Sequence, residues 1–298
     1  MISILIITKN ESQVLGGCIA SVSWSDDIHV YDSFSDDDTA AVATALRAKV
    51  TQRVFDGYAT QRNSALHSLS FAYPWVLILD ADERVPDALA DEIKAFVAAD
   101  KEDIAACRMR RRDFFMGRHL AHAQISPYYV RLVRPKLVHY EREVNEVLVV
   151  DGAIKELTQP FDHYPFSKGI HRWFEKHNTY STMEARQVIL ANQQKTVFSF
   201  QMMLFCSDFN QRRAHQKEFF NKLPGRPLLK FFYMFLFRRS FMDGAPGVTY
   251  ALLQTIYEYM IVIKVKELEA QVDGAYPTTV TLGQVSGVEL EQNTAPTN

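Results

Sequence analysis

Cysteine is scarce in this sequence: three among 298 residues, Cys18, Cys107 and Cys206. They are far apart, odd in number and form no Cys-x-x-Cys pair, so the sequence predicts neither a disulfide framework nor a cysteine zinc site. So few cysteines are typical of proteins in a reducing compartment, and we expect a cytoplasmic location.

Long apolar runs are also missing. Crossing a bilayer takes roughly 18–20 apolar residues without charge. The nearest stretch, residues 248–263, is interrupted by Gln254 and Glu258. The first residues, MISILIITKNE, have no basic segment before the apolar one, so we do not expect a signal peptide.

Net charge is small, −2, and by itself it gives no reason to expect a nucleic-acid partner. The charge is nevertheless divided along the chain. Residues 1–103 contain 17 acidic and 8 basic side chains, whereas residues 211–240 contain 8 basic side chains and one acid, Glu218. Such a division often marks regions with different partners. Ordinary apolar (47%) and charged (23%) fractions exclude disorder, collagen and coiled coil for the whole chain.

Strand and helix patterns alternate through the first hundred residues. Apolar, β-branched segments predict buried strands at residues 2–8, 28–32, 50–55 and 75–79. Helices are predicted between and after them, at residues 40–49 with Thr39 as N-cap, 60–69, and 87–98 with Pro86 in the first turn. This order predicts a parallel α/β sheet.

The rest of the chain is less regular. We expect strands at residues 104–112 and 129–133, a helix at 169–191, and helices over 211–269 broken at 224–227 and 243–247. The predicted organisation is an α/β domain (1–210), a basic and aromatic helical region (211–270) and a flexible tail (271–298).

Polar clusters follow the predicted strands, at residues 8–11, 32–38 and 80–83. Ligands of such sheets bind beyond the carboxyl ends of the strands. Alternation places Asp80 and Asp82 on one side and Ala81 on the other, an arrangement that suits a divalent cation shared with diphosphate oxygens. The alternative is a surface turn with helix-capping acids. The acids at 36–38 equally suit a solvated helix cap, whereas Asp32 is expected to face the cleft.

The segments ISILIITKNE (2–11), VYDSFSDDDT (30–39), QRN (61–63) and LILDADER (77–84) resemble the donor-site motifs of family 2 glycosyltransferases. Downstream, FFMG (114–117), YVRLVR (129–134), VNEVLVVDG (144–152), DHY (162–164), KHNTYSTMEA (176–185) and FRRSFMDGAPG (237–247) resemble a bacterial subgroup that includes lipopolysaccharide inner-core β-glucosyltransferases. The family usually has Gly at the position of Phe34 and often at that of Asp38, a departure that concerns turn geometry.

The resemblance implies a GT-A fold, a mostly parallel sheet flanked by helices, with a C-terminal helical extension. It implies inverting, metal-dependent transfer of a hexose, expected to be glucose, from a UDP-sugar to a lipid-linked glycan of lipopolysaccharide, capsule or another surface polysaccharide. Mg²⁺ or Mn²⁺ would be the metal. The residues implied in donor and metal binding are Thr8, Asn10 and Glu11 at the base, Asp32 at the uracil or ribose, Arg62 at the diphosphate, Asp80 at the ribose and metal, and Asp82 at the metal.

Inversion by direct displacement needs a carboxylate as general base near the acceptor hydroxyl. Glu141, Glu143 and Glu146 are candidates. The subgroup usually has a His-Glu pair before a short strand and Gly, and Asn145-Glu146 fits that spacing. We therefore predict Glu146 as the base; the alternative is that these acids only pair with surface cations.

Two further residues match the subgroup. His163 could reach the metal or the diphosphate, or make a structural hydrogen bond. Lys176 could contact phosphate, or lie on an exposed helix face. His119 and His122 have helical spacing but no evident third ligand, so no zinc site is predicted.

Residues 223–241, LPGRPLLKFFYMFLFRRSF, combine cations with bulky aromatics. Such a segment can lie among lipid headgroups, and we expect a peripheral position on the inner face of a bacterial plasma membrane. The alternative is a core helix with solvated basic ends. Two other classes compete with the enzyme: a non-catalytic, membrane-associated protein that retains the fold, and a dehydrogenase or nucleotidyltransferase. The first is disfavoured by Asp80, Asp82 and a plausible base, the second by the lack of GxGxxG after the first strand.

Overall fold

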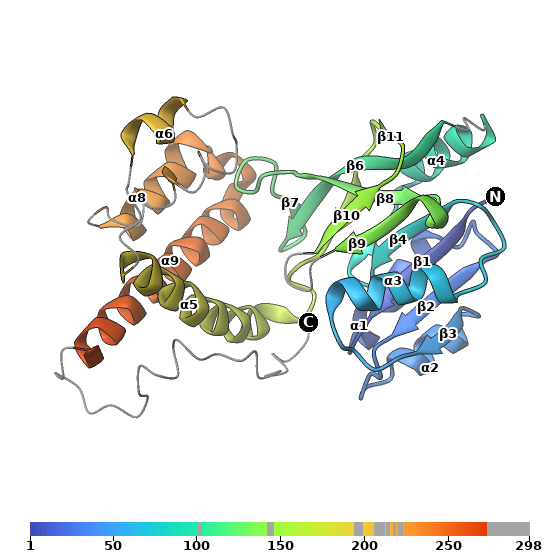
Figure 1. Cartoon of the computed structure of the whole chain (residues 1–298), viewed down its shortest axis with the longest axis horizontal. Helices are drawn as coiled ribbons and strands as arrows, with labels where there is room; N and C mark the ends of the chain where they lie inside the picture. The colour runs from blue at the N-terminus through green and yellow to red at the C-terminus, as the bar shows by residue number, and fades with distance from the viewer. Residues whose placement is uncertain are drawn as a thin grey trace. The chain divides into compact units, whose positions relative to one another are not determined.

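The computed structural model describes residues 1–99, 103–141, 146–193, 199–205, 212, 215–216, 219, 223 and 225–272. These residues form two compact units, the first ending at Ser167 and the second beginning at Lys168 (Figure 1). Several predictions lie outside the described residues: the boundary at 210–211, the tail from 273, and the residues Cys206, Glu143 and Asn145. The proposed domain limits therefore stay a prediction.

The first unit is built on a mixed sheet with the strand order β3-β2-β1-β4-β8-β6-β12-β5. The strands on this path are β1 (Ser3–Thr8), β2 (Ile28–Asp32), β3 (Lys49–Gln52), β4 (Val76–Asp80), β5 (Glu83–Arg84), β6 (Ile104–Phe115), β8 (Tyr128–Val133) and β12 (Phe161–His163). The neighbouring strands β3, β2, β1 and β4 are parallel, as predicted, and β8 runs antiparallel to both β4 and β6.

Four shorter strands complete this unit. β7 (Arg118–His119) and β11 (Ala153–Glu156) pair with β6, while β9 (Val138–Glu141) and β10 (Val147–Val150) form a separate antiparallel pair. The mixed strand pattern expected for residues 104–165 is therefore present. It supplies the strands that close the sheet beside β4.

Helices cover both faces of the sheet. They are α1 (Ser12–Ser21), α2 (Thr39–Ala45), α3 (Tyr58–Ser68) and α4 (Asp87–Ala98). Successive residues of β1 point to opposite faces: Ile4 and Ile6 belong to the core cluster with residues of α1, α2 and α4, and Leu5 belongs to the cluster with α3 and β9. α1 was not predicted; it is a helix that buries Leu15, Cys18 and Ile19 against the sheet.

The region around α2 departs from the prediction. Thr39 is the first helical residue rather than the N-cap, and the helix ends at Ala45. The Thr39 hydroxyl accepts a hydrogen bond from the Glu11 backbone and donates one to Asp37, so it ties two loops together. Arg47 has a positive φ of 62°, which a continuing helix cannot contain. Pro86, similarly, lies one residue before α4.

The second unit is helical. Its elements are α5 (Gly169–Gln193), α6 (Phe200–Phe205), α8 (Arg226–Phe232), the π-helical turn η2 (Tyr233–Phe237), the 3₁₀ turn η3 (Ser240–Asp243) and α9 (Gly244–Val272). The predicted break at 243–247 is present, because Gly244, with a φ of 73°, separates η3 from α9; a second break precedes η3 at Arg239, which has a φ of 57°. Gly247 lets η3 approach α9, because a Cβ there would lie 2.1 Å from the Ser240 carbonyl oxygen.

Helices α5 and α9 are joined by polar and aromatic contacts. The Lys264 ammonium donates to the Asn178 side chain at 2.7 Å and to the Ser181 hydroxyl at 2.8 Å. His177 stacks on Trp173 and meets the ring of Tyr257 edge-on. Among the residues that the structure describes, no helix is both long enough and apolar enough to cross a bilayer.

A buried carboxylate anchors the amino-terminal ends of the central strands. Asp27 accepts hydrogen bonds from the Ser3 hydroxyl at 2.5 Å, the Ala72 backbone at 2.8 Å and the Lys49 ammonium at 2.6 Å. His29 lies 2.9 Å from it as well. Burial by itself would raise the pKa of Asp27, but these hydrogen bonds outweigh it and hold the pKa well below its usual range.

We expect Asp27→Asn to destabilise the protein by about 2 kcal/mol at pH 7, because charge-assisted hydrogen bonds are lost. Because the pKa of Asp27 is lower in the folded than in the unfolded protein, its ionised carboxylate stabilises the fold above the unfolded pKa of about 4. This stabilisation is lost as the pH falls, so the difference in unfolding free energy between Asp27→Asn and wild type should shrink below about pH 4. Urea unfolding at pH 7 and pH 3 measures this. The neighbouring Asp26→Asn, at an exposed position, is the matched control. Equal losses in both variants, or a difference that grows in acid, would contradict the assignment.

Candidate active site

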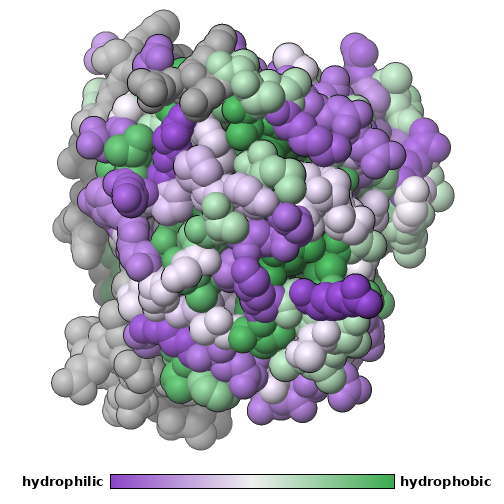
Figure 2. Space-filling model, turned by 90° about the vertical axis from the view of Figure 1, so that its right-hand side faces the viewer, coloured by the Kyte–Doolittle hydropathy of each residue, from purple (hydrophilic) through white to green (hydrophobic). Residues whose placement is uncertain are grey.

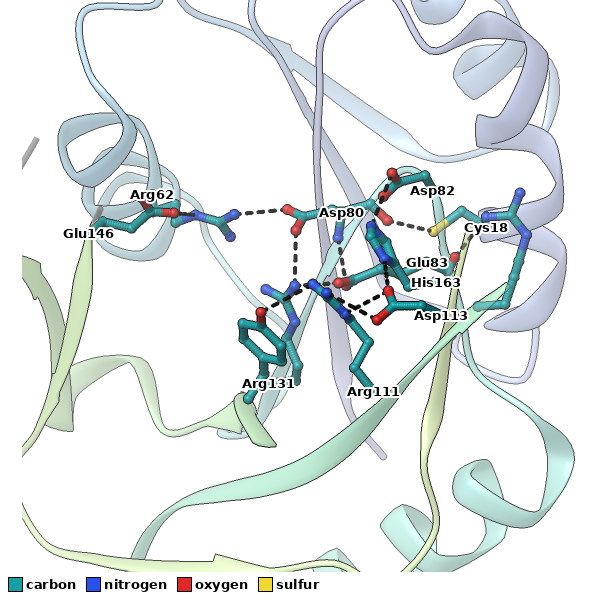
Figure 3. Close-up of polar contacts among 12 residues, drawn as sticks. Cys18, Arg62, Asp80, Asp82, Glu83, Arg111, Asp113, Arg131, Glu146 and His163 are labelled. Carbon is teal, nitrogen blue, oxygen red and sulfur yellow. Dashed lines mark hydrogen bonds and ion pairs between the residues drawn. The ribbon is translucent and has the colours of Figure 1, made fainter. Parts of the chain in front are cut away.

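Asp80 ends β4 in contact with two arginines (Figure 3). Alternation along β4 puts Ile78 and Asp80 on the α3 side of the sheet, where Arg62 lies. Arg62 donates from Nη2 to one Asp80 oxygen at 2.8 Å, and Arg131 of β8 donates from Nη2 to the other at 2.9 Å. Ala81 turns the opposite way, into the core cluster with α1 and α4.

Glu83 adds a second, fully buried carboxylate to this cluster. It accepts a hydrogen bond from Arg131 and another from the Asp80 backbone at 3.0 Å. Burial raises the pKa of Glu83 to about 7, with Arg131 opposing and Asp80 adding to the shift. Burial would raise the pKa of Asp80 too, but Arg62 and Arg131 outweigh it and hold that pKa below its usual range.

Asp82 lies beside a histidine that a third carboxylate orients. On β12, His163 pairs with Asp113 of β6 and with Glu83 of β5 in the strand register. Its Nδ1 is 2.5 Å from Asp113 Oδ1, and its Nε2 is 3.3 Å from Asp82 Oδ2. Burial would lower the pKa of His163, but hydrogen bonds with Asp113 and Asp82 outweigh it and raise the pKa to about 9.

The residues that could hold a metal ion are Asp82 and His163. Within the described ranges no group of three or more His, Cys, Asp or Glu side chains is arranged to bind a cation. A carboxylate and an imidazole whose other nitrogen meets a buried carboxylate are nevertheless a common partial ligand set. Such a set fits a divalent cation whose remaining ligands are substrate oxygens and water. Both Asp80 oxygens already accept guanidinium hydrogen bonds, so Asp80 as a direct ligand stays a prediction.

Glu146, just before β10, joins the same cluster. Its Oε1 is 3.4 Å from Arg62 Nε, so Arg62 lies between Glu146 and Asp80 (Figure 3). Glu141, by contrast, is an exposed residue of β9 paired with His139 at 3.1 Å. Of the two candidate bases that the structure describes, Glu146 is the one that it brings to the strand-end carboxylates.

The loops after β1 and β2 are tied together. Asn10, at a φ of 55°, accepts a hydrogen bond from the Asp36 backbone at 2.8 Å, and its own N–H donates to the Ser35 hydroxyl at 2.8 Å. The Glu11 N–H donates to Thr39. Thr8 is buried next to Asp32 in the register of β1 and β2, and its hydroxyl has no hydrogen-bond partner among the residues that the structure describes. These loops border the carboxyl edge of the sheet.

Asp32 supports the second loop from within. It accepts hydrogen bonds from the Ser35 backbone at 2.9 Å, from the Ser35 hydroxyl and from Gln52 at 2.9 Å. Asp37 accepts hydrogen bonds from the backbones of Ser12 and Thr39 at 3.1 and 3.0 Å, a capping role that the sequence left open. Contact of Asp32 with a donor remains a prediction.

Lys176 lies on α5 in the second unit, where its ammonium is 5.5 Å from the centre of the Tyr180 ring. The two units are not placed relative to each other, so phosphate contact by Lys176 stays a prediction.

Sequence reasoning missed three members of the cluster: Glu83, Arg131 and Asp113. Glu83 belongs to the quoted segment LILDADER, and Arg131 to YVRLVR. A charged residue inside an apolar strand was the available signal for Arg131, because a buried charge needs a partner. Asp113 gave a weaker signal, as the one acid beside three successive arginines.

Comparison with known proteins agrees with this geometry. Residues 3–142 match the family model described as Glycosyl transferase family 2. An uncharacterized glycosyltransferase of Rickettsia conorii is 29% identical over 285 residues, which cover 89% of this chain and 90% of that protein. A lipopolysaccharide core biosynthesis glycosyltransferase, LpsC, of Rhizobium meliloti is 26% identical over 279 residues, covering 90% and 93%.

A looser likeness is found among solved structures. Glucosyl-3-phosphoglycerate synthase from Mycobacterium tuberculosis, in complex with Mn²⁺, uridine diphosphate and phosphoglyceric acid, has a TM-score of 0.40 and 18% identity, covering 55% of this chain and 70% of that one.

Over residues 3–142 this chain matches glycosyl transferase family 2, and over about nine tenths of its length it is similar to glycosyltransferases. It is a glycosyltransferase that uses a nucleotide sugar, and its mixed α/β sheet flanked by helices, with the long helix α9, confirms the predicted GT-A fold.

Phe34 lies at a position where the family motif usually has Gly, and the structure explains how this departure is accommodated. It has a φ of 52°, so the chain keeps at this position the backbone conformation that Gly adopts easily. Half of its side chain is exposed, so few packing contacts depend on it.

We expect Phe34→Gly to stabilise the protein by about 1 kcal/mol, because a left-handed residue with a Cβ costs about 1–2 kcal/mol. Urea unfolding measures the change, with Leu46→Gly, an exposed apolar residue at negative φ, as the control that should lose stability. A loss of stability in Phe34→Gly comparable to that in Leu46→Gly would contradict the account.

Proposed function

We propose that this enzyme transfers glucose from UDP-glucose, with inversion, to a lipid-linked glycan in lipopolysaccharide core biosynthesis. The observation that carries the proposal is the position of Arg62, which contacts Asp80 on one side and Glu146 on the other. Arg62 therefore connects Asp80, at the strand end expected to bind the donor, with Glu146, a carboxylate suited to act as the base. The similarity to the Rhizobium meliloti core enzyme supports the acceptor class.

In this proposal Asp82 and His163 hold Mg²⁺ or Mn²⁺, and Asp113 keeps the His163 ring in place. The cation would offset negative charge on the departing nucleotide diphosphate. Arg62 meets the same diphosphate, and Arg131 holds Asp80 toward the ribose. Thr8, Asn10, Glu11 and Asp32 border the base pocket. The unpartnered Thr8 hydroxyl is the group best placed to bond the donor.

Glu146 accepts the proton of the attacking acceptor hydroxyl. Its ion pair with Arg62 orients the carboxylate beside Asp80. A donor diphosphate competes for the same guanidinium, so donor binding loosens that ion pair and leaves Glu146 available to the acceptor. The proposal therefore favours binding of donor before acceptor. A lipid-linked acceptor would bring the enzyme to the inner face of the plasma membrane.

Asp82→Ala should weaken Mn²⁺-dependent binding of UDP by more than about 100-fold, because replacing even an outer-shell partner costs about 10–100-fold. UDP binding without metal should change little. Isothermal titration calorimetry with UDP, with and without Mn²⁺, tests this. Asp91→Ala, at an exposed acid of α4, is the control. Unchanged Mn²⁺-dependent affinity in Asp82→Ala would remove Asp82 from the metal site.

Glu146→Gln should lower kcat about 1,000-fold and leave UDP affinity within twofold, because a positioned base contributes about 10²–10⁴-fold. Transfer of radiolabelled glucose from UDP-glucose to lipopolysaccharide of a core-truncated strain is the measurement. Glu141→Gln, in the neighbouring strand, should keep its activity. The assignment fails if Glu146→Gln turns over normally, and loss of activity in Glu141→Gln would move the base to that residue.

A further inference from the structure

The surface of α8, η2 and η3 exposes an unusual set of apolar side chains. Helix α8 packs on α9 (Figure 1). Arg226 of α8 and Met234 of η2 are buried. The exposed residues, which we name the apolar stripe, are Leu228, Leu229, Phe232, Tyr233, Leu236, Phe237, Phe241 and Met242. Phe237 is 80% exposed and Leu228 63%. Contiguous exposed apolar surface of this kind marks a binding surface rather than ordinary solvated protein.

The apolar stripe carries charge of one sign only. Residues 225–242 contain four cations, Arg226, Lys230, Arg238 and Arg239, and no acid. Arg226 is buried and pairs with Glu258 at 2.8 Å, while Arg239 is exposed. Aromatic rings flanked by Lys and Arg are the pattern by which a helix lies among anionic headgroups. On the face of the molecule that Figure 2 shows, apolar residues lie interspersed with hydrophilic ones.

Two occupants compete for this surface: a second copy of the chain and a lipid bilayer. A symmetric contact between copies would bury the same basic surface of both copies against each other, and like charges repel. An anionic bilayer offers the opposite charge together with an apolar interior. The charge pattern therefore favours lipid.

An apolar pocket adjoins the apolar stripe in the same unit. It has a volume of about 920 Å³ and shares Leu228 with the stripe. Its wall combines Ile256, Val262 and Val265 of α9 with the charged residues Arg226, Lys266 and Glu269. The pocket therefore adds apolar area next to Leu228, and the preference for lipid rests on the charge pattern of the stripe.

We propose that the apolar stripe is a peripheral docking surface for an anionic phospholipid bilayer. The aromatic and leucine side chains enter the headgroup boundary, and Lys230 and Arg239 meet lipid phosphates. The surface gives the enzyme access to its lipid-linked acceptor. This purpose of docking rests on the proposed function. Docking itself requires neither donor nor acceptor, so its test is separate from the tests of catalysis.

Flotation of the full chain with vesicles of phosphatidylcholine and phosphatidylglycerol tests the proposal. We expect the protein to float with these vesicles at 0.1 M salt and to float much less with phosphatidylcholine alone. Leu236→Ser combined with Phe237→Ser should weaken binding about tenfold or more, because affinity follows buried apolar area. Lys230→Gln combined with Arg239→Gln should weaken it about fivefold for each cation removed.

The matched control is Val54→Ser combined with Ile125→Ser, two apolar residues of the first unit that are 70% and 65% exposed. It should float like the wild type, and circular dichroism should show all variants folded. Failure of the wild type to float with anionic vesicles would overturn the proposal, as would equal flotation of the Leu236 and Phe237 variant. A dimer that this variant dissociates, without flotation of the wild type, would assign the surface to a second copy instead.

Discussion

The candidate site depends on one buried cation, Arg131. Its guanidinium lies between Asp80, which ends β4, and Glu83, which begins β5 after a two-residue turn. Burying a charge costs several kcal/mol unless partners compensate, and removing one partner of such a pair typically costs about 3–5 kcal/mol. The turn is therefore held in one shape from the inside. That shape leaves Asp82, which lies between Asp80 and the buried Glu83 in the sequence, facing His163 at the edge of the sheet.

Arg62 extends this network to the acceptor side. It shares Asp80 with Arg131 and reaches Glu146 ahead of β10. Asn63, the next residue of α3, exchanges hydrogen bonds with the backbone of Tyr140 in β9, which fixes the helix against the β9–β10 pair. A single side chain, Arg62, therefore connects Asp80 with Glu146. The proposed order of binding follows from that shared contact.

Much of this arrangement could be predicted from the sequence, because it depends on local patterns. Continuous apolar, β-branched segments predicted β1, β2 and β4, and the polar clusters after them predicted the edge where Asp80, Asp82 and Asp32 lie. Pairing between distant strands could not be predicted. Arg131 and Asp113 reach the cluster only because β8 lies between β4 and β6 and because β12 pairs with both β6 and β5. The short helix α1 was missed because Gly16 and Gly17 dilute its apolar pattern. Gly17 is needed there, since a Cβ would lie 2.8 Å from the Arg84 guanidinium.

The central claim is that Glu146 and the Asp82–His163 pair act on opposite ends of one direct displacement. The most direct measurement is the configuration of the new glycosidic bond, determined by NMR on the product formed from UDP-α-glucose and a lipopolysaccharide core acceptor. One displacement inverts the anomeric carbon, so the account predicts a β-linked glucose. An α-linked product would contradict it, because retention requires a different use of these carboxylates.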